Sequence, residues 1–485
     1  MKAYIFLSVH EELFHRVAER LRDHYGVDEF CGFAWGHQQA SSIANRGITY
    51  DPMVVFTRDL LPQIDNGPPD LAWLEQRERE LGVSLARMIA SERHLLKGRT
   101  YTQIQRMVEV ALREIAAAYD RAKPDFVYTE DVSCFHSYVH YILAKERGIP
   151  FWRIGTGRLP NRLAIYDRGL QKLGRIDDLY HEILARGLTD AERAIATDYV
   201  AKFRNRPARM PGMDVRGARP GIALSDLGRL VTSVRHYLGD PGNPTAIPPW
   251  QVLRQRLTRI ARVAVADRAD IFEPPVPGEK YLLYPLHFQP EASTLVQAPL
   301  YMDQVPLLQD IARSLPIGHR LYVKEHVSSR GRRPLSFYRE LKKIEQVRLL
   351  SPNEDTWSLI RGAAVVAVIT GTAGWEGLLF DKPVITFGDV FFNELPHTIK
   401  ASDYPKDRWY EMLRRAIFEH QPDHRSLLAY IAAMHLGSFP GVIHNPTTFP
   451  HVLEDQNVQH LADALAITIG LTRSAERRIH TGAGR

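Results

Sequence analysis

Three groups of polar and glycine residues follow apolar stretches in the last third of the chain, and their side chains suit an anionic ligand. They are HFQPEAS after residues 281–285, KEH after residues 321–323, and TGTAGWE after residues 365–369. Apolar, β-branched runs of this kind are typical of buried parallel strands. Since the carboxyl ends of parallel strands meet at one edge of a sheet, we expect the three groups to line a common ligand site.

The third group predicts a strand, a glycine turn and a helix that begins near Thr372. Gly371 and Gly374 permit a tight approach of the backbone, and free N–H groups at a helix start favour an anion. Glu376 is the candidate for binding ribose hydroxyls, whereas Trp375 is expected in the core. The binding residues expected here are Thr370, Gly371, Thr372, Ala373, Gly374 and Glu376. The competing explanation is structural, because Gly and Thr are common wherever a strand turns into a helix.

The first two groups supply hydrogen-bonding and charged side chains. Gln289 and Ser293 are candidates for binding a phosphate or carboxylate, and Glu291 for proton transfer; the alternative is that Glu291 and Ser293 cap a helix. Lys324 and His326 point the same way along an extended chain, where they would neutralise the charge of a leaving group. The alternative for this pair is a surface lysine and a structurally bonded histidine.

A fourth group of polar residues follows the predicted strand 125–129. Glu130 and Asp131 are candidate catalytic carboxylates, as a general base or as a nucleophile. Asp131 is alternatively a helix cap. His136 is a candidate for orienting such a carboxylate or, equally, a core residue, and His10 at the end of the first strand is a weaker candidate.

Composition excludes several classes of protein. The 485 residues are 45% hydrophobic and 24% charged, as in soluble globular proteins, and no apolar run is long enough to cross a bilayer. The N-terminus is interpreted as a strand and a helix, not as a signal peptide. Two cysteines form neither a disulfide framework nor a zinc site, which favours a cytoplasmic protein. No metal motif is present, and we expect neither a metal nor a cofactor.

The net charge is +6, and much of it comes from two basic stretches, residues 202–219 and 254–262. A solvated surface is the commonest reason for such stretches. The functional alternative is attraction to anionic lipid at the inner membrane face or to an acidic glycan. Nucleic acid is not expected as a partner, because the stretches lack interleaved aromatic residues and a binding motif.

Alternating strand and helix patterns predict two α/β domains. The expected ranges are 1–169 for a Rossmann-like acceptor domain, 170–277 for a helical, Arg- and Pro-rich insertion or linker, 278–450 for a Rossmann-like nucleotide-binding domain, and 451–485 for a helix with a basic tail. Two such domains that face a cleft form the GT-B architecture.

KEH followed by TGTAGWEGLLFDKPVITFGDVFF resembles the capsule polysaccharide biosynthesis family, which includes bacterial β-Kdo transferases. The resemblance covers about residues 281–396. It implies a GT-B glycosyltransferase without a metal, with CMP-Kdo as the most directly implied donor. The nucleotide sugar would lie among Gln289, Glu291, Ser293, Lys324, His326 and the residues 370–376. The chain departs from the family at Val327, where proline is usual, and at QPE, where the Kdo transferases tend to have an aspartate.

The resemblance predicts transfer of a sugar to a glycan or lipid-linked acceptor. Whether the reaction retains or inverts configuration stays open. A sugar-nucleotide 2-epimerase of the same architecture and a non-catalytic glycan-binding or export-assembly protein are the alternatives.

Overall fold

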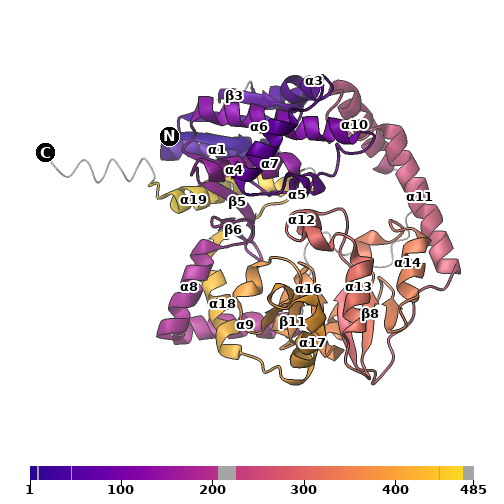
Figure 1. Ribbon diagram of the computed structural model, residues 1–485. Coiled ribbons are helices and arrows are strands. Elements are labelled where there is room, and N and C mark those ends of the chain that lie inside the picture. The colour runs from indigo at the N-terminus through magenta and orange to yellow at the C-terminus, as the bar shows by residue number, and fades with distance from the viewer. Residues whose placement is uncertain (8–9, 45, 206–224, 447, 473–485) are drawn as a thin grey trace. The chain divides into compact units, whose positions relative to one another are not determined.

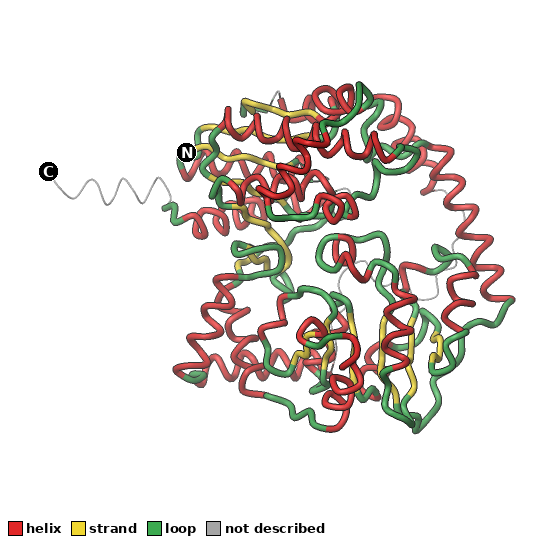
Figure 2. Tube along the Cα trace, in the orientation of Figure 1, coloured by secondary structure: helices red, strands yellow, loops and turns green. Residues whose placement is uncertain are grey.

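The computed structural model describes residues 1–7, 10–44, 46–205, 225–446 and 448–472. The chain divides into two compact units, each built on its own sheet. Unit 1 comprises residues 1–176, 231–248 and 434–485, and unit 2 comprises residues 177–230 and 249–433. Figures 1 and 2 show helices along both sheets, the layering expected of α/β proteins.

Unit 1 contains a seven-stranded sheet in the order β13-β6-β5-β4-β1-β2-β3. The strands are β1 Lys2–Phe6, β2 Glu29–Ala34, β3 Tyr50–Val55, β4 Phe126–Thr129, β5 Phe151–Thr156, β6 Arg162–Tyr166 and β13 Phe439–Pro440. The strands β1 to β5 are parallel, whereas β6 and β13 run antiparallel to their neighbours. The parallel part has the strand order of a Rossmann fold, in which the order reverses between β1 and β4.

Unit 2 contains a six-stranded, wholly parallel sheet in the order β12-β11-β10-β7-β8-β9. The strands are β7 Tyr281–Pro285, β8 Arg320–Lys324, β9 Val347–Leu350, β10 Val365–Val368, β11 Val384–Thr386 and β12 Thr398–Lys400. This is again the Rossmann order, and it reverses between β7 and β10. Ligands of such sheets bind outside the carboxyl ends of the strands, at the point of reversal, which we call the switch point.

The helices of unit 1 cover both faces of its sheet. They are α1 Glu11–Tyr25, α2 His37–Ala44, α3 Leu61–Ile64, α4 Leu71–Leu81, α5 Leu85–Ala90, α6 Tyr101–Ala122, α7 Phe135–Glu146 and α19 Asp455–Ile469, with a π-helical turn at Phe56–Leu60 and a 3₁₀ turn at Pro450–Leu453. Helix α6 begins with a capping box formed by Thr100 and Gln103. Helix α19 packs against α1, where Leu461 and Leu465 are fully buried. Burying one such side chain contributes about 1.5–3 kcal/mol.

Unit 2 is covered in the same way. Its helices are α9 Asp190–Asn205, α11 Pro249–Arg268, α12 Ala292–Leu295, α13 Gln304–Arg313, α14 Leu335–Lys342, α15 Thr356–Gly362, α16 Thr372–Leu379 and α17 Trp409–Phe418, with 3₁₀ turns at Pro299–Tyr301, Val327–Ser329, Phe391–Glu394, Ala401–Asp403 and Lys406–Arg408. Three helices include residues of both units: α8 Gly174–Arg186, α10 Ser225–Gly239 and α18 His424–Gly437.

The prediction of two Rossmann-like α/β domains is confirmed, and the compact units divide the chain at other positions than the expected ranges. Residues 434–472 join unit 1 instead of the second domain, because β13 pairs with β6 and α19 packs on α1. The described residues between 170 and 277 contain the helices α8, α9, α10 and α11, and their interpretation as an insertion or linker stays a prediction. Helix α9 packs on α16 of unit 2, where Arg204 forms an ion pair of 2.6 Å with Asp381.

The basic stretch 202–219 lies largely outside the described residues, as do residues 8 and 9 of the expected first strand and the basic tail 473–485. Within the described part, Lys202 pairs with Asp198 at 2.6 Å. The carbonyl of Leu379 accepts a hydrogen bond of 2.6 Å from Arg204. Arg204 therefore has a structural role in holding α9 on unit 2.

Candidate functional site

The switch point of unit 2 is organised around His287, the second residue after β7. Its side chain is buried, and its Nε2 accepts a hydrogen bond of 2.9 Å from the backbone N–H of Ile369 at the end of β10. Burial lowers the pKa of His287 to about 3, with smaller contributions from His326 and Arg333. A neutral imidazole therefore ties the two strands together at the place where their order reverses.

Gln289 is engaged within unit 2. Its carbonyl oxygen accepts a hydrogen bond of 2.8 Å from Gln304, and its amide donates to the backbone oxygen of Met302. Gln304 also accepts from the N–H of His287 at 2.9 Å. The expected role of Gln289 in binding a ligand stays a prediction, and these contacts give its side chain a fixed position at the edge of the sheet.

Glu291 and Ser293 follow at the start of α12. Glu291 occupies the N-cap position but makes no side-chain cap bond, and its Oε2 accepts a hydrogen bond of 2.9 Å from the Ser293 hydroxyl. The backbone oxygen of Ser293 accepts a second bond, also 2.9 Å, from the Thr370 hydroxyl. The structure thus brings the first and third sequence groups together, and the exposed carboxylate of Glu291 lies at their junction.

Lys324 is the last residue of β8 and is buried, and His326, two residues later, is half-buried. Lys324 Nζ donates to the backbone oxygens of Pro352 (3.3 Å) and Glu325 (3.4 Å). Burial lowers the pKa of His326 to about 4, and the nearby charges of Lys324 and Arg333 lower it further. His326 Nδ1 accepts a hydrogen bond of 3.1 Å from Ser328 and so shapes the turn after KEH, at the position where Val327 replaces the usual proline.

Glu376 in α16 completes this group of ionisable side chains. Burial raises its pKa to about 7, while the hydrogen bond from Trp357 and the charge of Lys324 act in the opposite direction. The Trp357 indole donates to Glu376 Oε2 at 3.2 Å. A carboxyl group with this pKa exchanges a proton near neutral pH, and perturbed groups of this kind concentrate at functional sites.

The glycines of TGTAGWE allow close packing inside unit 2. A Cβ on Gly374 would lie 2.8 Å from the Phe392 ring and 2.9 Å from Val368, and one on Gly371 would lie 3.1 Å from His287. Trp375 is buried against Phe391 and Phe392, as expected of a core residue. The structural explanation for Gly374 is therefore sufficient, while Gly371 also places the start of α16 next to the switch point.

An arginine that was not among the predicted site residues joins the end of β7 to the end of β8. Arg333 donates to Glu325 Oε1 at 2.7 Å and to the backbone oxygen of His287. Glu325 is fully buried and also accepts from Tyr338 at 2.6 Å and from the N–H of His326 at 2.5 Å. The signal for such a partner was Glu325, the acidic residue inside KEH, because a buried charge requires a partner. Nothing local marks Arg333.

The switch point of unit 1 contains a contact between the side chains of His10, which follows β1, and Glu130, which follows β4. His10 Nε2 lies 2.7 Å from Glu130 Oε2, and the two side chains are 3% and 33% exposed. His444 lies close by: burial lowers its pKa, as do His451 and His10, whereas Glu130 raises it. The two carboxylates expected after β4 are thus at the carboxyl edge of the sheet, and His10, the weaker sequence candidate, is in direct contact with one of them.

Asp131 and His136 have other surroundings. Asp131 pairs with the buried Arg153 of β5. It does not cap the following helix, because Cys134 is the N-cap residue of α7. His136 is fully buried in an aromatic cluster with ring centroids of Trp35 and Phe56 each at 5.1 Å. Burial lowers its pKa to about 4. The core interpretation of His136 is therefore correct.

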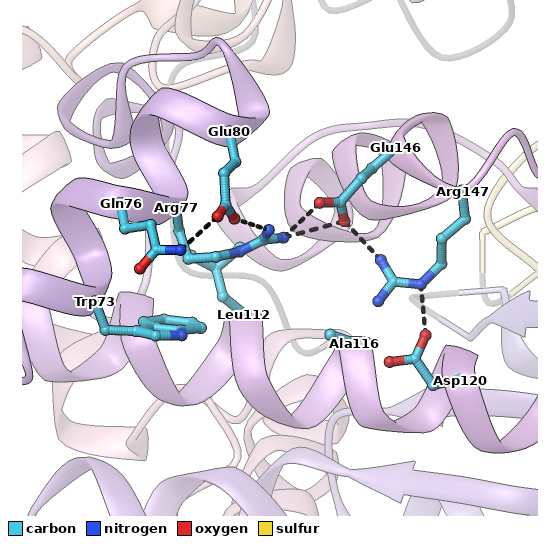
Figure 3. Close-up of a pocket in the computed structure, with 9 residues that line it drawn as sticks. All are labelled: Trp73, Gln76, Arg77, Glu80, Leu112, Ala116, Asp120, Glu146 and Arg147. Carbon is cyan, nitrogen blue, oxygen red and sulfur yellow. Dashed lines mark hydrogen bonds and ion pairs between the residues drawn. The ribbon is translucent and has the colours of Figure 1, made fainter.

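A surface hollow of about 530 Å³ lies elsewhere in unit 1, on helices α4, α6 and α7 (Figure 3). It is lined by Trp73, Gln76, Arg77, Glu80, Leu112, Ala116, Asp120, Glu146 and Arg147. Its charges satisfy one another: Arg77 pairs with Glu80 and Glu146, and Arg147 with Glu146 and Asp120. None of the sequence-predicted site residues lines it, and its paired charges leave little to bind a ligand.

Across the part of the chain that the structure describes, no three His, Cys, Asp or Glu side chains gather in a way that would hold a metal ion. The expectation of a reaction without metal or cofactor stays a prediction. Among the described helices, none has the length and apolar character that a bilayer-spanning helix requires.

Comparison with known proteins places a family match on unit 2. Residues 280–420 match the family model "Capsule polysaccharide biosynthesis protein". No protein of curated function matches the sequence. Among solved structures, the chain is similar to the β-Kdo 2,7 transferase KpsC of Thermosulfurimonas dismutans, with 14% identity, 74% of this chain and 89% of that chain covered, and a TM-score of 0.38.

The chain is also similar to the UDP-GlcNAc 2-epimerase of Neisseria meningitidis, solved with UDP-GlcNAc, with 13% identity, 90% and 98% coverage, and a TM-score of 0.24. These structural similarities are too low to assign a function. The family match covers all three sequence groups of unit 2. It confirms for residues 280–420 that this protein resembles the capsule polysaccharide biosynthesis family.

Proposed function

We propose that the protein is a glycosyltransferase of bacterial surface polysaccharide synthesis, which moves a sugar from a nucleotide donor to a glycan or lipid-linked acceptor. The observation that carries this proposal is the grouping of Lys324, His326 and Glu376 at the carboxyl edge of the unit 2 sheet. All three residues lie within the segment that matches the capsule family. An edge of this kind is where Rossmann-like sheets bind nucleotides.

Unit 2 would hold the donor. Lys324 supplies a positive charge for its phosphate, and the start of α16 supplies backbone N–H groups next to Gly371. Glu376 would accept hydrogen bonds from the ribose hydroxyls. When the bond between the anomeric carbon and the phosphate oxygen breaks, negative charge grows on the nucleotide, and a fixed cation stabilises that charge.

Unit 1 would serve the acceptor. The proton of the acceptor hydroxyl would pass to Glu130, and His10 at 2.7 Å would stabilise the carboxylate in its ionised form. An inverting reaction needs only this base. A retaining double displacement needs a carboxylate nucleophile in addition, for which Asp131 is the candidate. CMP-Kdo is the first donor to test, since the family resemblance implies it.

The first experiment is a thermal-shift panel with CMP, UDP, GDP and dTDP. A ligand that binds only the native state raises the melting temperature by an amount set by its concentration and affinity. We expect one base to stabilise the protein, and that base names the donor class. If none of the four nucleotides stabilises it, the protein is a glycan-binding or assembly protein and the proposal fails.

The second experiment removes the proposed phosphate contact. Lys324→Met should weaken nucleotide binding by roughly 10–100-fold in calorimetry, because a hydrogen bond to a charged group contributes about 1.5–3 kcal/mol. The matched control is Lys343→Met, whose ammonium is exposed and pairs with Glu340 at 2.6 Å. Equal affinities of Lys324→Met and Lys343→Met would show that the phosphate lies elsewhere.

The third experiment separates transfer from epimerisation. The donor is incubated with and without an acceptor, and the sugar products are analysed by mass spectrometry and NMR. Transfer requires the acceptor and releases a free nucleotide. Conversion of the sugar nucleotide to its 2-epimer without any acceptor would identify an epimerase instead.

A further inference from the structure

Helix α11 of unit 2 carries an apolar stripe on its solvent-exposed side. The stripe consists of Trp250, Leu253, Leu257 and Val265, which are 64%, 51%, 52% and 44% exposed. The first three follow one another at spacings of three and four residues, so they lie on one face of the helix. Single exposed apolar residues need no explanation, whereas a row of them on one element marks a surface that contacts something apolar.

The opposite side of α11 is held on unit 2 by arginines. Arg259 donates to the backbone oxygen of Arg330 at 2.8 Å, and Arg262 donates to that of Arg332. Gly331 makes this approach possible, since a Cβ there would lie 2.6 Å from the Arg259 oxygen and 2.7 Å from Val263. An ordinary surface helix turns its apolar side to the protein. Helix α11 also turns Val263 and Ala266 to the core of unit 2, so the apolar stripe is a second apolar surface, on the outward side of the helix.

The charge around the stripe is positive. Helix α11 contains five arginines and one acidic residue, Asp267. Arg254 and Arg268 are exposed and, by helical spacing, lie within 40° of the direction of Trp250 on the helix. A surface of Trp and Leu flanked by Arg matches the boundary of an anionic bilayer, where apolar side chains enter the acyl region and arginines reach the headgroups.

We propose that the outer stripe of α11 docks the protein on the surface of an anionic lipid bilayer. A second copy of the chain is the less suitable occupant, because two stripes in contact would bring the arginines of both helices together. The inference does not depend on the proposed transferase activity. It places the lipid contact on the side of α11 opposite to Arg330 and Arg332, the partners of Arg259 and Arg262.

The test is co-sedimentation of the protein with vesicles of phosphatidylcholine alone or of phosphatidylcholine mixed with phosphatidylglycerol. We expect binding to the mixed vesicles and at least fivefold weaker binding to the neutral ones. Leu253→Gln/Leu257→Gln should lower binding to mixed vesicles by about tenfold or more. The matched control is Leu300→Gln/Leu436→Gln, which removes two leucines that are 84% and 45% exposed elsewhere.

The charge is tested separately. Arg254→Gln/Arg268→Gln should lower binding to mixed vesicles by about 30-fold, because each arginine near an anionic surface contributes about 1 kcal/mol. Its control is Arg313→Gln/Arg408→Gln, two exposed arginines outside α11 that pair with Asp310 and Glu411. Added salt should weaken the binding of the native protein as well.

Two results would overturn the proposal. The first is equal binding of Leu253→Gln/Leu257→Gln and its control to mixed vesicles. The second is a native protein that does not bind vesicles but forms dimers in sedimentation velocity, with these dimers lost in Leu253→Gln/Leu257→Gln. The melting temperature and the nucleotide-induced thermal shift of the variant should equal those of its control, so that loss of lipid binding is distinct from failure to fold or to bind the donor.

Discussion

At the switch point of unit 1, two ionisable side chains contact each other, His10 and Glu130 at 2.7 Å. At the switch point of unit 2, a neutral imidazole accepts a hydrogen bond from the main chain, and the ionisable groups stand beside it on β8 and α16. The first arrangement is suited to moving a proton. In the second, we propose that the lysine and the carboxyl group of raised pKa contact a ligand, so that the same strand order would support two different chemical tasks.

Glu130→Gln should have the largest effect on this comparison. Loss of a positioned proton acceptor is expected to lower the transfer rate by about 10²–10⁴-fold, while donor binding by unit 2 is retained. Turnover with the donor found in the nucleotide panel measures the transfer rate, and calorimetry measures donor binding. The control is Glu340→Gln, which changes an exposed glutamate that pairs with Lys343. A variant that keeps its rate would remove proton transfer from the role of unit 1.

Glu325→Ala should have the largest effect on stability. It leaves Arg333 buried without its carboxylate, which typically costs about 3–5 kcal/mol of unfolding free energy. Urea unfolding measures the loss. Glu340→Ala breaks an exposed pair and should cost less than about 1 kcal/mol. Similar losses for the two variants would mean that the network around Glu325 does not hold β7 and β8 together.

Glu376→Gln tests the raised pKa of unit 2. A carboxyl group with an ordinary pKa of 4.5 in the unfolded chain and about 7 in the fold binds more protons when folded. Its contribution to stability is therefore complete below pH 4.5 and is lost as the pH rises through 7, up to about 2–3 kcal/mol. The glutamine variant should lack this decline in urea unfolding between pH 4.5 and 7.5. The same decline in both proteins would contradict the assignment.

Two buried histidines give the smallest effects. His287→Phe orphans the N–H of Ile369 and should cost about 1–3 kcal/mol. His136→Phe should change stability by less than about 1 kcal/mol at neutral pH, because neither ring nitrogen has a hydrogen-bond partner in the structure. Thermal unfolding compares them directly, and equal losses would erase the distinction between a bonded and a packed histidine.

Acid should also distinguish His136→Phe from the native protein. The pKa of His136 is about 4 in the fold and near 6.5 in the unfolded chain, so the unfolded state binds more protons between these values. The stability from this residue is present above pH 6.5 and is lost as the pH falls through 4. The phenylalanine variant should therefore lose less stability in acid.

Much of this architecture was predictable from local pattern. Strand β7 begins and ends where the predicted run 281–285 does, and Glu130 and Asp131 lie at the strand edge where they were expected. Short strands such as β13, with two residues, carry no pattern of their own. They form because a distant strand offers free backbone groups, which no local window contains.

The candidate site was predictable as a set of positions and less so as a set of contacts. The spacing of Lys324 and His326 indicated a shared side of the strand, but not that Lys324 would bind Pro352 or that His326 would order the following turn. No local pattern marks Arg333 or Trp357 themselves, since each reaches its partner through the fold. Burial raises the pKa of Glu376, and that burial is visible only in three dimensions.

Residues 434–472 belong to unit 1 although most of unit 2 precedes them in the sequence, which affects the folding of unit 1 during synthesis. A ribosome adds about 5–20 residues per second, so roughly 15–50 s separate the synthesis of Ile176 from that of Met434. Throughout that interval β6 is paired on one side by β5 but lacks β13 on the other, and α1 lacks α19. During this interval the nascent unit 1 therefore exposes an unpaired strand edge and an apolar helix face. A chaperone that binds at this stage would cover both.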